Sequence, residues 1–180
     1  MQDKFRVIMN KVTNKEFISL NIAVVTFSDT RTFENDTSGK FLEDSITKSG
    51  HNFIIRKIVR EDINNIRNTI EELLKNNPDV IITTGGTGFT SKDLTHQALF
   101  PLLTKHITGF GELFRHLSYL DIGSATIQSN AFAGFIGKVM LFCLPGSTGA
   151  CKLAWQKILE LQLNSTTNPC NLVTIVKNHL

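Results

Sequence analysis

Short runs of apolar and β-branched residues recur along this 180-residue chain, and a segment with helical periodicity follows each of them. The clearest runs are Asn21–Phe27, Val80–Thr83 and Val139–Leu144, which lack the polar alternation of a half-exposed strand. Such runs are typical of strands buried on both faces of a sheet. His51–Val59 is also predicted to be a strand. This alternation constrains the fold most strongly, because it requires helices on both faces of a sheet.

Apolar residues at helical spacing predict the helices between these strands. The helices are expected from about Phe41 to Gly50, from Ile63 to Leu74, from Asp93 to Leu103, from Gly109 to Leu120 and from Ala150 to Leu163. The Gly- and Ala-rich segment from Ile122 to Gly137 contains short apolar pieces and receives no assignment. Strands and helices in this order predict a single α/β domain with a mostly parallel sheet and right-handed crossovers.

Composition and charge exclude several classes of protein. Hydrophobic residues make up 41% of the chain and charged residues 19%, which is typical of a globular domain. The net charge of +3 is spread along the chain and argues against nucleic acid binding. No apolar stretch has the length of a membrane span or of a signal peptide core. Cys143, Cys151 and Cys170 form no C-x-x-C pair, so we expect a cytoplasmic protein with reduced thiols and no membrane partner.

Three loops leave the apolar strands at their carboxyl ends, where parallel sheets bind ligands. They are Ser28–Arg31, Thr84–Gly88 and Pro145–Thr148, and we expect them to form one site. The glycines of the second loop permit backbone conformations and close approaches that other residues forbid. Successive backbone N–H groups there could hold a phosphate or another oxyanion. A tight strand-to-helix turn without a ligand would explain the same residues.

Acidic residues follow the same strand ends. Asp93 lies just after the glycine loop, where its carboxylate could hold a Mg²⁺ ion that bridges phosphates, or could cap a helix. Glu61 follows the strand His51–Val59 and could share that ion or take part in capping the next helix. Asp29 and Asp36 could bind a ligand or close turns. Asp93 is therefore the strongest acidic candidate.

The order and spacing of five motifs resemble one protein family. The motifs are Ser28-Asp29-Thr30-Arg31, Asp36-Thr37-Ser38-Gly39, Thr84-Gly85-Gly86-Thr87-Gly88 followed by Asp93, Gly109-Phe110-Gly111-Glu112, and Leu144-Pro145-Gly146-Ser147. From about Glu16 to about Asn171 the chain resembles the MoaB/Mog family of molybdenum-cofactor biosynthesis proteins, and its GFGELFR and NPCN segments are closer to the MoaB branch. We accordingly expect an N-terminal extension at residues 1–15, a MoaB/Mog-like domain at 16–171 and a C-terminal tail at 172–180.

The resemblance implies a three-layer α/β/α sandwich that forms a homotrimer or homohexamer, binds molybdopterin and has other cofactor-biosynthesis proteins as possible partners. Catalytic members of the family adenylylate molybdopterin: its terminal phosphate attacks the α-phosphorus of Mg-ATP, and pyrophosphate leaves. By similarity, Asp93 and Glu61 would be the catalytic residues and would bind Mg²⁺. The residues expected to bind ATP and molybdopterin are Asp29, Thr30, Asp36, Thr84, Gly85, Gly86, Thr87, Gly88, Ser129, Pro145, Gly146 and Ser147.

One position departs from the family pattern. After Gln128-Ser129 the family commonly has an arginine, whereas this chain has Asn130, which cannot neutralise a phosphate. Arg31 or Lys138 could supply the missing charge. The departure supports an alternative function, in which the chain binds molybdopterin or acts as a scaffold in the same pathway without catalysis.

Overall fold

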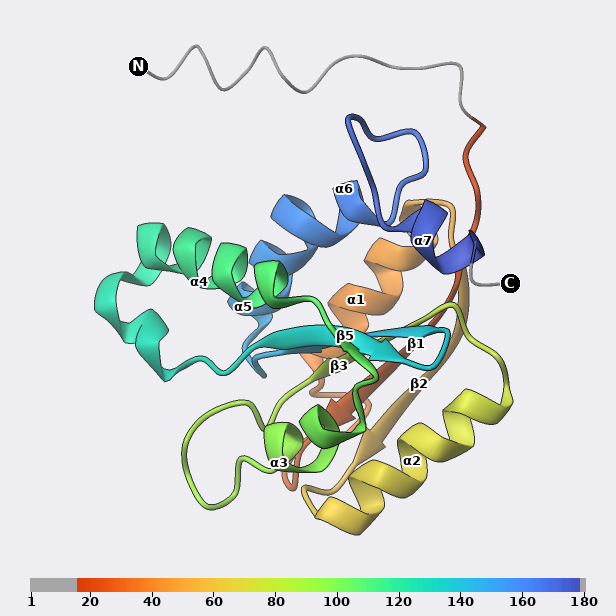
Figure 1. Ribbon diagram of the computed structural model, residues 1–180. Coiled ribbons are helices and arrows are strands. Elements are labelled where there is room, and N and C mark those ends of the chain that lie inside the picture. The colour runs from red at the N-terminus through yellow and green to blue at the C-terminus, as the bar shows by residue number, and fades with distance from the viewer. Residues whose placement is uncertain (1–15, 179–180) are drawn as a thin grey trace.

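The computed structural model describes residues 16–178, so the predicted N-terminal extension lies outside the described residues. A sheet of six strands, in the order β2-β1-β3-β6-β5-β4, forms its centre (Figure 1). The strands are β1 (Asn21–Phe27), β2 (Asn52–Val59), β3 (Val80–Thr84), β4 (Lys105–His106), β5 (Phe132–Ile136) and β6 (Val139–Leu144). β2, β1, β3 and β6 are parallel, whereas β5 is antiparallel to both β6 and β4. The predicted mostly parallel sheet is confirmed.

Helices cover both faces of this sheet (Figure 1). One face packs against α1 (Thr37–Lys48), α4 (Thr108–Ile122), α5 (Thr148–Ala154), the π-helical segment η4 (Trp155–Leu159) and α7 (Val173–Asn178), and the short helix α6 (Glu160–Gln162) follows η4. The other packs against α2 (Ile63–Lys75), α3 (Thr95–Leu99) and the short 3-10 helix η2 (Phe100–Leu102). A longer 3-10 segment, η3 (Gly123–Gln128), follows α4. Within residues 16–178, no helix is both long and apolar enough to cross a membrane.

Alternate residues of the central strands face opposite cores. In β1, Ile22 and Val24 belong to the core beneath α1 and α4, whereas Ala23 and Val25 belong to the core against α2. All of these side chains are fully buried. Because both faces are covered, residues on both sides of the strand are mainly apolar, which explains the hydrophobic runs.

The register of the three central strands places their loops at one edge of the sheet. Thr26 of β1 pairs with Thr84 of β3, and Thr84 pairs with Leu144 of β6. The strands therefore end at the same level, and the loops that follow them leave the sheet together. This arrangement confirms that three loops distant in the sequence meet at one place.

Two segments differ from their predicted structure. The helix expected over Asp93–Leu103 is confined to α3 and η2, because the Asp93 carboxylate accepts hydrogen bonds from the backbone N–H and the hydroxyl of Thr90. Asp93 thus closes a turn within the loop instead of starting a helix. The unassigned segment Ile122–Gly137 contains η3 and β5. The edge strand β4 has only two residues, too few to produce a periodic pattern.

The packed domain continues beyond Asn171, the end that we expected for it. Val173 and Val176 of α7 are buried in the core beneath α1 and α4. Lys177 also forms an ion pair with Asp79, with 2.8 Å between Nζ and Oδ1. The segment predicted as a C-terminal tail is therefore part of the fold, because the six-residue helix α7 contributes two apolar side chains to the core.

Replacing Val176 by Ala is expected to lower the free energy of unfolding by about 2 kcal/mol, because the change removes two buried carbon groups and leaves a small cavity. Ile175→Ala is the matched control, since Ile175 lies on the same helix and is 39% exposed. Urea denaturation measures both variants. Equal effects of the two substitutions would contradict the packing of α7 against the core.

Candidate functional site

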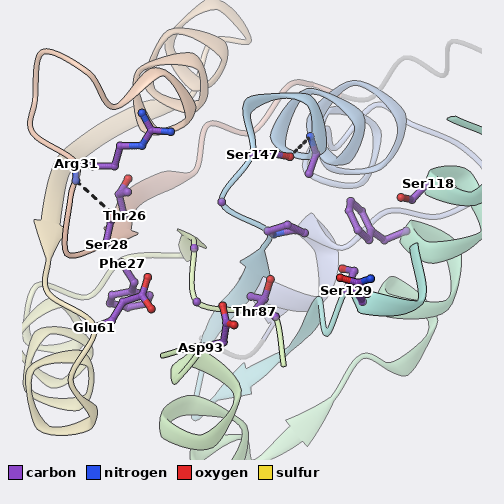
Figure 2. Close-up of a pocket in the computed structure, with 18 of the residues that line it drawn as sticks. Thr26, Phe27, Ser28, Arg31, Glu61, Thr87, Asp93, Ser118, Ser129 and Ser147 are labelled. Carbon is purple, nitrogen blue, oxygen red and sulfur yellow. Dashed lines mark hydrogen bonds between the residues drawn. The ribbon is translucent and has the colours of Figure 1, made fainter. Parts of the chain in front are cut away.

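A cavity of about 470 Å³ opens at the carboxyl ends of β1, β3 and β6 (Figure 2). Most of the predicted site residues line it, and all of them except Ser129 come from loops that follow β1, β2, β3 and β6. These residues are Thr30, Asp36, Glu61, Gly85, Gly86, Thr87, Gly88, Asp93, Ser129, Pro145, Gly146 and Ser147. Thr84 and Asp29 are not among the lining residues. Most of the residues predicted from the sequence therefore line one cavity, whereas Thr84 is buried beneath it and Asp29 is exposed outside it.

The backbone of the glycine loop runs close to the end of β1. Gly85 has φ +102°, and a Cβ atom built on it would lie 2.2 Å from the carbonyl oxygen of Phe27. A side chain here would therefore require both a rare backbone conformation and displacement of β1. The Gly85 N–H donates to the Leu144 carbonyl, and the Thr95 hydroxyl donates to the Gly85 carbonyl. The loop is thus fixed between β1, β6 and α3.

Thr84 anchors this loop to the loop that follows β6. Its side chain is fully buried, and its hydroxyl donates to the carbonyl oxygen of Pro145 at 2.9 Å. The hydroxyl also lies 3.2 Å from the Cys151 sulfur. These contacts make Thr84 a structural residue of the site, in place of the predicted ligand contact.

Asp93 is held in its charged form by neighbouring donors. Partial burial acts to raise its pKa, but hydrogen bonds from the Thr90 hydroxyl and from the N–H groups of Thr90 and Gly88 outweigh that effect. The pKa of Asp93 consequently lies below its ordinary value. The bonds from Thr90 measure 2.6 Å and 2.8 Å, and both reach the same carboxylate oxygen. Asp93 therefore lines the cavity as a fixed anion.

The pKa of Glu61 is shifted in the opposite direction to that of Asp93. Desolvation raises its pKa, and the negative charges of Asp93 and Asp29 raise it further. Asp29 also accepts a hydrogen bond from the Glu61 backbone N–H at 3.2 Å, so it positions the loop that carries Glu61. Two carboxylates whose pKa values are shifted in opposite directions thus line one cavity. Their mutual repulsion would be relieved by a bound cation.

Asp36 lines the same cavity, but its carboxylate already has partners. It caps α1 by accepting a hydrogen bond from the Gly39 N–H at 2.9 Å. It also accepts a bond from the Thr26 hydroxyl at 2.8 Å and forms an ion pair with Arg56 at 3.3 Å. Because Asp36 is only 2% exposed, we assign it to holding the loop in place rather than to binding substrate.

Ser129 presents a polar atom that has no partner within residues 16–178. Its hydroxyl oxygen is buried, and the residue lines the cavity (Figure 2). A buried hydroxyl without a hydrogen bond costs free energy, so such atoms in native proteins usually have a specific role. A polar group of a ligand could satisfy it.

One wall of the cavity, formed by α4 and η3, was not predicted from the sequence. Phe114, Ser118 and Ile122 of α4 line it, together with residues of η3. These positions are spaced by four residues, so they lie on one face of the helix. That spacing was visible in the sequence, but nothing there indicated that this face borders the three loops.

Arg31 and Lys138 are the two candidates to supply the positive charge that Asn130 lacks, and they lie at opposite ends of the sheet. Arg31 lines the cavity. Lys138 lies in the turn between β5 and β6, whereas the cavity is at the other end of β6. The expectation that Lys138 could replace the charge is therefore wrong, because a six-residue strand separates it from the cavity.

Glu61→Gln tests the electrostatics of the site without any ligand. A carboxylate whose folded-state pKa is raised favours the fold below its unfolded-state pKa of about 4.5, and that contribution disappears as pH rises through the folded-state pKa. Without Mg²⁺, the variant should therefore unfold at a slightly higher temperature than the parent near neutral pH. The gain in free energy of unfolding should be less than about 1 kcal/mol, because solvent screens the charges. The difference should vanish in acid, as measured by calorimetry.

Glu71→Gln, at an exposed position on α2, controls for the loss of one negative charge from the whole protein. A lower unfolding temperature for Glu61→Gln near neutral pH would contradict the proposed repulsion around Glu61.

Comparisons with known proteins agree with this architecture. Residues 23–165 match the family model described as "Probable molybdopterin binding domain". The chain is 43% identical over 157 residues to molybdenum cofactor biosynthesis protein B of Escherichia coli, covering 87% of this chain and 92% of that protein. It also resembles a crystal structure of molybdenum cofactor biosynthesis protein B, with a TM-score of 0.82, 38% identity and coverage of 92% and 98% of the two chains.

A second solved structure, the tungsten cofactor synthesizing protein MoaB from Pyrococcus furiosus, matches with a TM-score of 0.75 and 32% identity over 89% of this chain and 96% of that one. The sequence match and both structural matches extend over nearly the whole described domain. They agree with the motifs around the cavity and with the three-layer arrangement. The chain therefore belongs to the MoaB/Mog family of molybdenum-cofactor biosynthesis proteins, within its MoaB branch.

Proposed function

We propose that the chain adenylylates molybdopterin with Mg-ATP. An oxygen of the terminal phosphate of molybdopterin forms a bond to the α-phosphorus of ATP, and the bond between that phosphorus and the bridging oxygen of the β-phosphate breaks. Pyrophosphate leaves with the electron pair. The observation that carries this proposal is the meeting of the glycine loop Gly85–Gly88 with Asp93 and Glu61 in one cavity.

The carboxylates fit a Mg²⁺ ion that is shared with substrate phosphates. Within residues 16–178, no three His, Cys, Asp or Glu side chains are close enough to hold a metal ion by themselves. Mg²⁺ at phosphoryl-transfer sites is commonly held by one or two carboxylates together with substrate phosphates. Glu61 and Asp93 would provide the carboxylates, and bound Mg²⁺ supplies neutralisation of the charge on the reacting phosphates.

The other residues of the cavity would position the phosphates. The backbone of Gly86 and Thr87 lines the cavity and would offer N–H groups to a phosphate, whereas the Gly88 N–H already donates to Asp93. Ser147 caps α5 by accepting a hydrogen bond from the Ala150 N–H at 3.2 Å, which leaves its own hydroxyl hydrogen free to donate. Ser129 offers a second hydroxyl. Donors fixed by the fold lose little entropy when a phosphate binds.

No strong general base is needed for this reaction. The terminal phosphate of molybdopterin is a monoester, whose second pKa is about 6, so it is largely deprotonated near neutral pH. Phosphoryl-type transfer depends mainly on alignment and on neutralisation of charge. The absence of a Ser-His-Asp or Cys-His arrangement from the lining residues is consistent with that requirement.

Association into a homotrimer or homohexamer is also proposed. Large apolar side chains are exposed on α4 and η3, namely Leu113, Tyr119, Leu120 and Ile127, together with Ile122 at the edge of the cavity. A group of large exposed apolar side chains on one segment is typical of an interface between proteins. These residues support the contact of one copy of the chain with another.

The decisive experiment is an assay of pyrophosphate release from ATP with purified protein, Mg²⁺ and molybdopterin. Release that requires the pterin would support the adenylyltransferase. Binding of molybdopterin without release would contradict it, and would favour the alternative of a molybdopterin-binding or scaffolding protein.

A further inference from the structure

The charge of the cavity is unbalanced. Among the described residues that line it, Asp36, Glu61 and Asp93 carry carboxylates, whereas Arg31 is the one cationic side chain. Arg56, which does not line the cavity, forms an ion pair with Asp36 and neutralises its charge. Lys92 is near enough to Glu61 to lower its pKa, but it is not among the lining residues. A polyphosphate that enters the cavity would therefore meet a single protein cation, Arg31.

Hydrogen bonds of the main chain hold Arg31 in place, and most N–H donors of its guanidinium remain available. The Ser28 hydroxyl oxygen accepts hydrogen bonds from the N–H groups of Thr30 and Arg31, both at 3.2 Å (Figure 2). One guanidinium nitrogen of Arg31 donates to the Asn35 carbonyl at 3.1 Å. Within residues 16–178, no carboxylate forms an ion pair with Arg31. A guanidinium has five N–H donors, so a planar fork remains for a phosphate.

The loop around Arg31 is itself ordered. The Asn35 side-chain oxygen accepts the Thr32 N–H at 2.8 Å, and the Asp36 N–H donates to the Thr32 carbonyl at 2.9 Å. These bonds hold in place the Asn35 carbonyl, which accepts the hydrogen bond from the Arg31 guanidinium. Arg31 is thus oriented before a ligand binds, which reduces the entropy that binding must remove.

Position 130 does not line this cavity. Its backbone N–H donates to the Thr87 carbonyl at 3.0 Å, so Asn130 lies behind the glycine loop. The residue lines a separate cavity of about 320 Å³, together with Arg115. Arg115 donates a hydrogen bond to the Ala131 carbonyl in that region at 3.1 Å. An arginine at position 130 would add charge to the second cavity.

We propose that Arg31 is the phosphate-binding cation of the site, with its guanidinium donating hydrogen bonds to phosphate oxygens of the nucleotide from the loop that follows β1. The assignment of the nucleotide rests on the proposed function. The geometry favours an anion that brings a divalent cation, because Asp93 and Glu61 line the same cavity and would repel an anion alone. Arg31 lies on the same side of the cavity as Ser28, with Ser147 across from it (Figure 2).

The test uses isothermal titration calorimetry with two probes, inorganic tripolyphosphate and ATP, each with Mg²⁺. Arg31→Ala should weaken the binding of both probes by about tenfold to a hundredfold, because it removes charge-assisted hydrogen bonds. It should also reduce the dependence of affinity on salt concentration. Arg31→Lys should recover part of the affinity, since it restores the charge without the planar fork.

Lys138→Ala is the matched control, because it removes one cation from the opposite end of β6 and should leave both affinities unchanged. Asn130→Arg should also fail to restore binding to Arg31→Ala. Thermal unfolding of Arg31→Ala should match the parent, because the exposed side chain makes one hydrogen bond.

The outcomes separate this inference from the proposed function. Unchanged affinity in Arg31→Ala, no binding of tripolyphosphate by the parent, or recovery of binding through Asn130→Arg would each overturn the role of Arg31. If binding depends on Arg31 but the parent releases no pyrophosphate, the inference stands and the adenylyltransferase fails. If pyrophosphate release is intact in Arg31→Ala at every ATP concentration, the role of Arg31 is rejected while the activity stands.

Discussion

Asp93→Asn is expected to lower pyrophosphate release by about two to three orders of magnitude, the range that follows from loss of one fixed electrostatic contact to a transition state. The substitution keeps the shape of the side chain but removes the charge that would hold Mg²⁺ against the phosphates. Its effect should appear in kcat, because the interaction with the reacting phosphates strengthens as charge develops. Steady-state kinetics with Mg²⁺, ATP and molybdopterin measure the change.

The fold should survive this substitution. The Asn side-chain oxygen can still accept hydrogen bonds from Thr90, so the turn after the glycine loop is retained. Asp62→Asn is the matched control, since Asp62 caps α2 outside the cavity and Asn is an equally good cap. Turnover of Asp93→Asn at the parental rate would exclude Asp93 from the metal site. Loss of turnover in both variants would indicate a general effect of charge.

The central strands and their loops could be predicted because the information is local. An unbroken apolar run such as Val80–Thr83 specifies a strand covered on both faces, and the parallel arrangement brings its loop to the carboxyl edge. The glycine loop followed by Asp93 then marks the cavity. These inferences need no knowledge of which residues pack together, since each follows from a single segment and its order in the chain.

The remaining features depend on contacts between distant segments. No local pattern indicates that α4 borders the cavity, or that Val173 and Val176 reach the core from beyond Asn171. The sequence favoured Asp93 among the acidic residues but did not show which of the others have structural partners. Asp36 and Asp93 both follow turn-forming residues, yet the Asp36 carboxylate pairs with Arg56, which lies twenty residues away, whereas the partner of the Asp93 carboxylate is the nearby Thr90. Side-chain roles of this kind are determined by tertiary partners.

Thr84 illustrates the same limit within the most informative motif. It belongs to the glycine loop by sequence, but it lies at the end of β3 and is buried between strands. Its hydroxyl donates a hydrogen bond to the Pro145 carbonyl. The motif therefore contains two kinds of residue. Thr84 joins the loops that follow β3 and β6, whereas Gly86 to Gly88 face the cavity. Only the second kind is available to contact a ligand.

Gly85→Ala is expected to lower the free energy of unfolding by about 3 kcal/mol, because an L-residue at φ +102° is strained and its Cβ would lie 2.2 Å from the Phe27 carbonyl oxygen. In a protein of this size the melting temperature should fall by about 6 to 12 °C. The backbone of β1 is paired on both sides, with β2 and with β3, so it cannot move away without loss of ladder hydrogen bonds. Calorimetry measures the change.

Gly109→Ala separates this effect from the general consequence of replacing glycine. Gly109 lies within α4, and a Cβ there meets no atom within 4 Å, so alanine should stabilise the helix by up to about 1 kcal/mol. Opposite signs for the two substitutions are therefore expected. Because the loop that Gly85 begins also carries the proposed phosphate donors, polyphosphate affinity should fall in Gly85→Ala even at temperatures where the variant is fully folded. A variant that keeps both its stability and its affinity would show that the close approach of Gly85 to β1 is not required for the site.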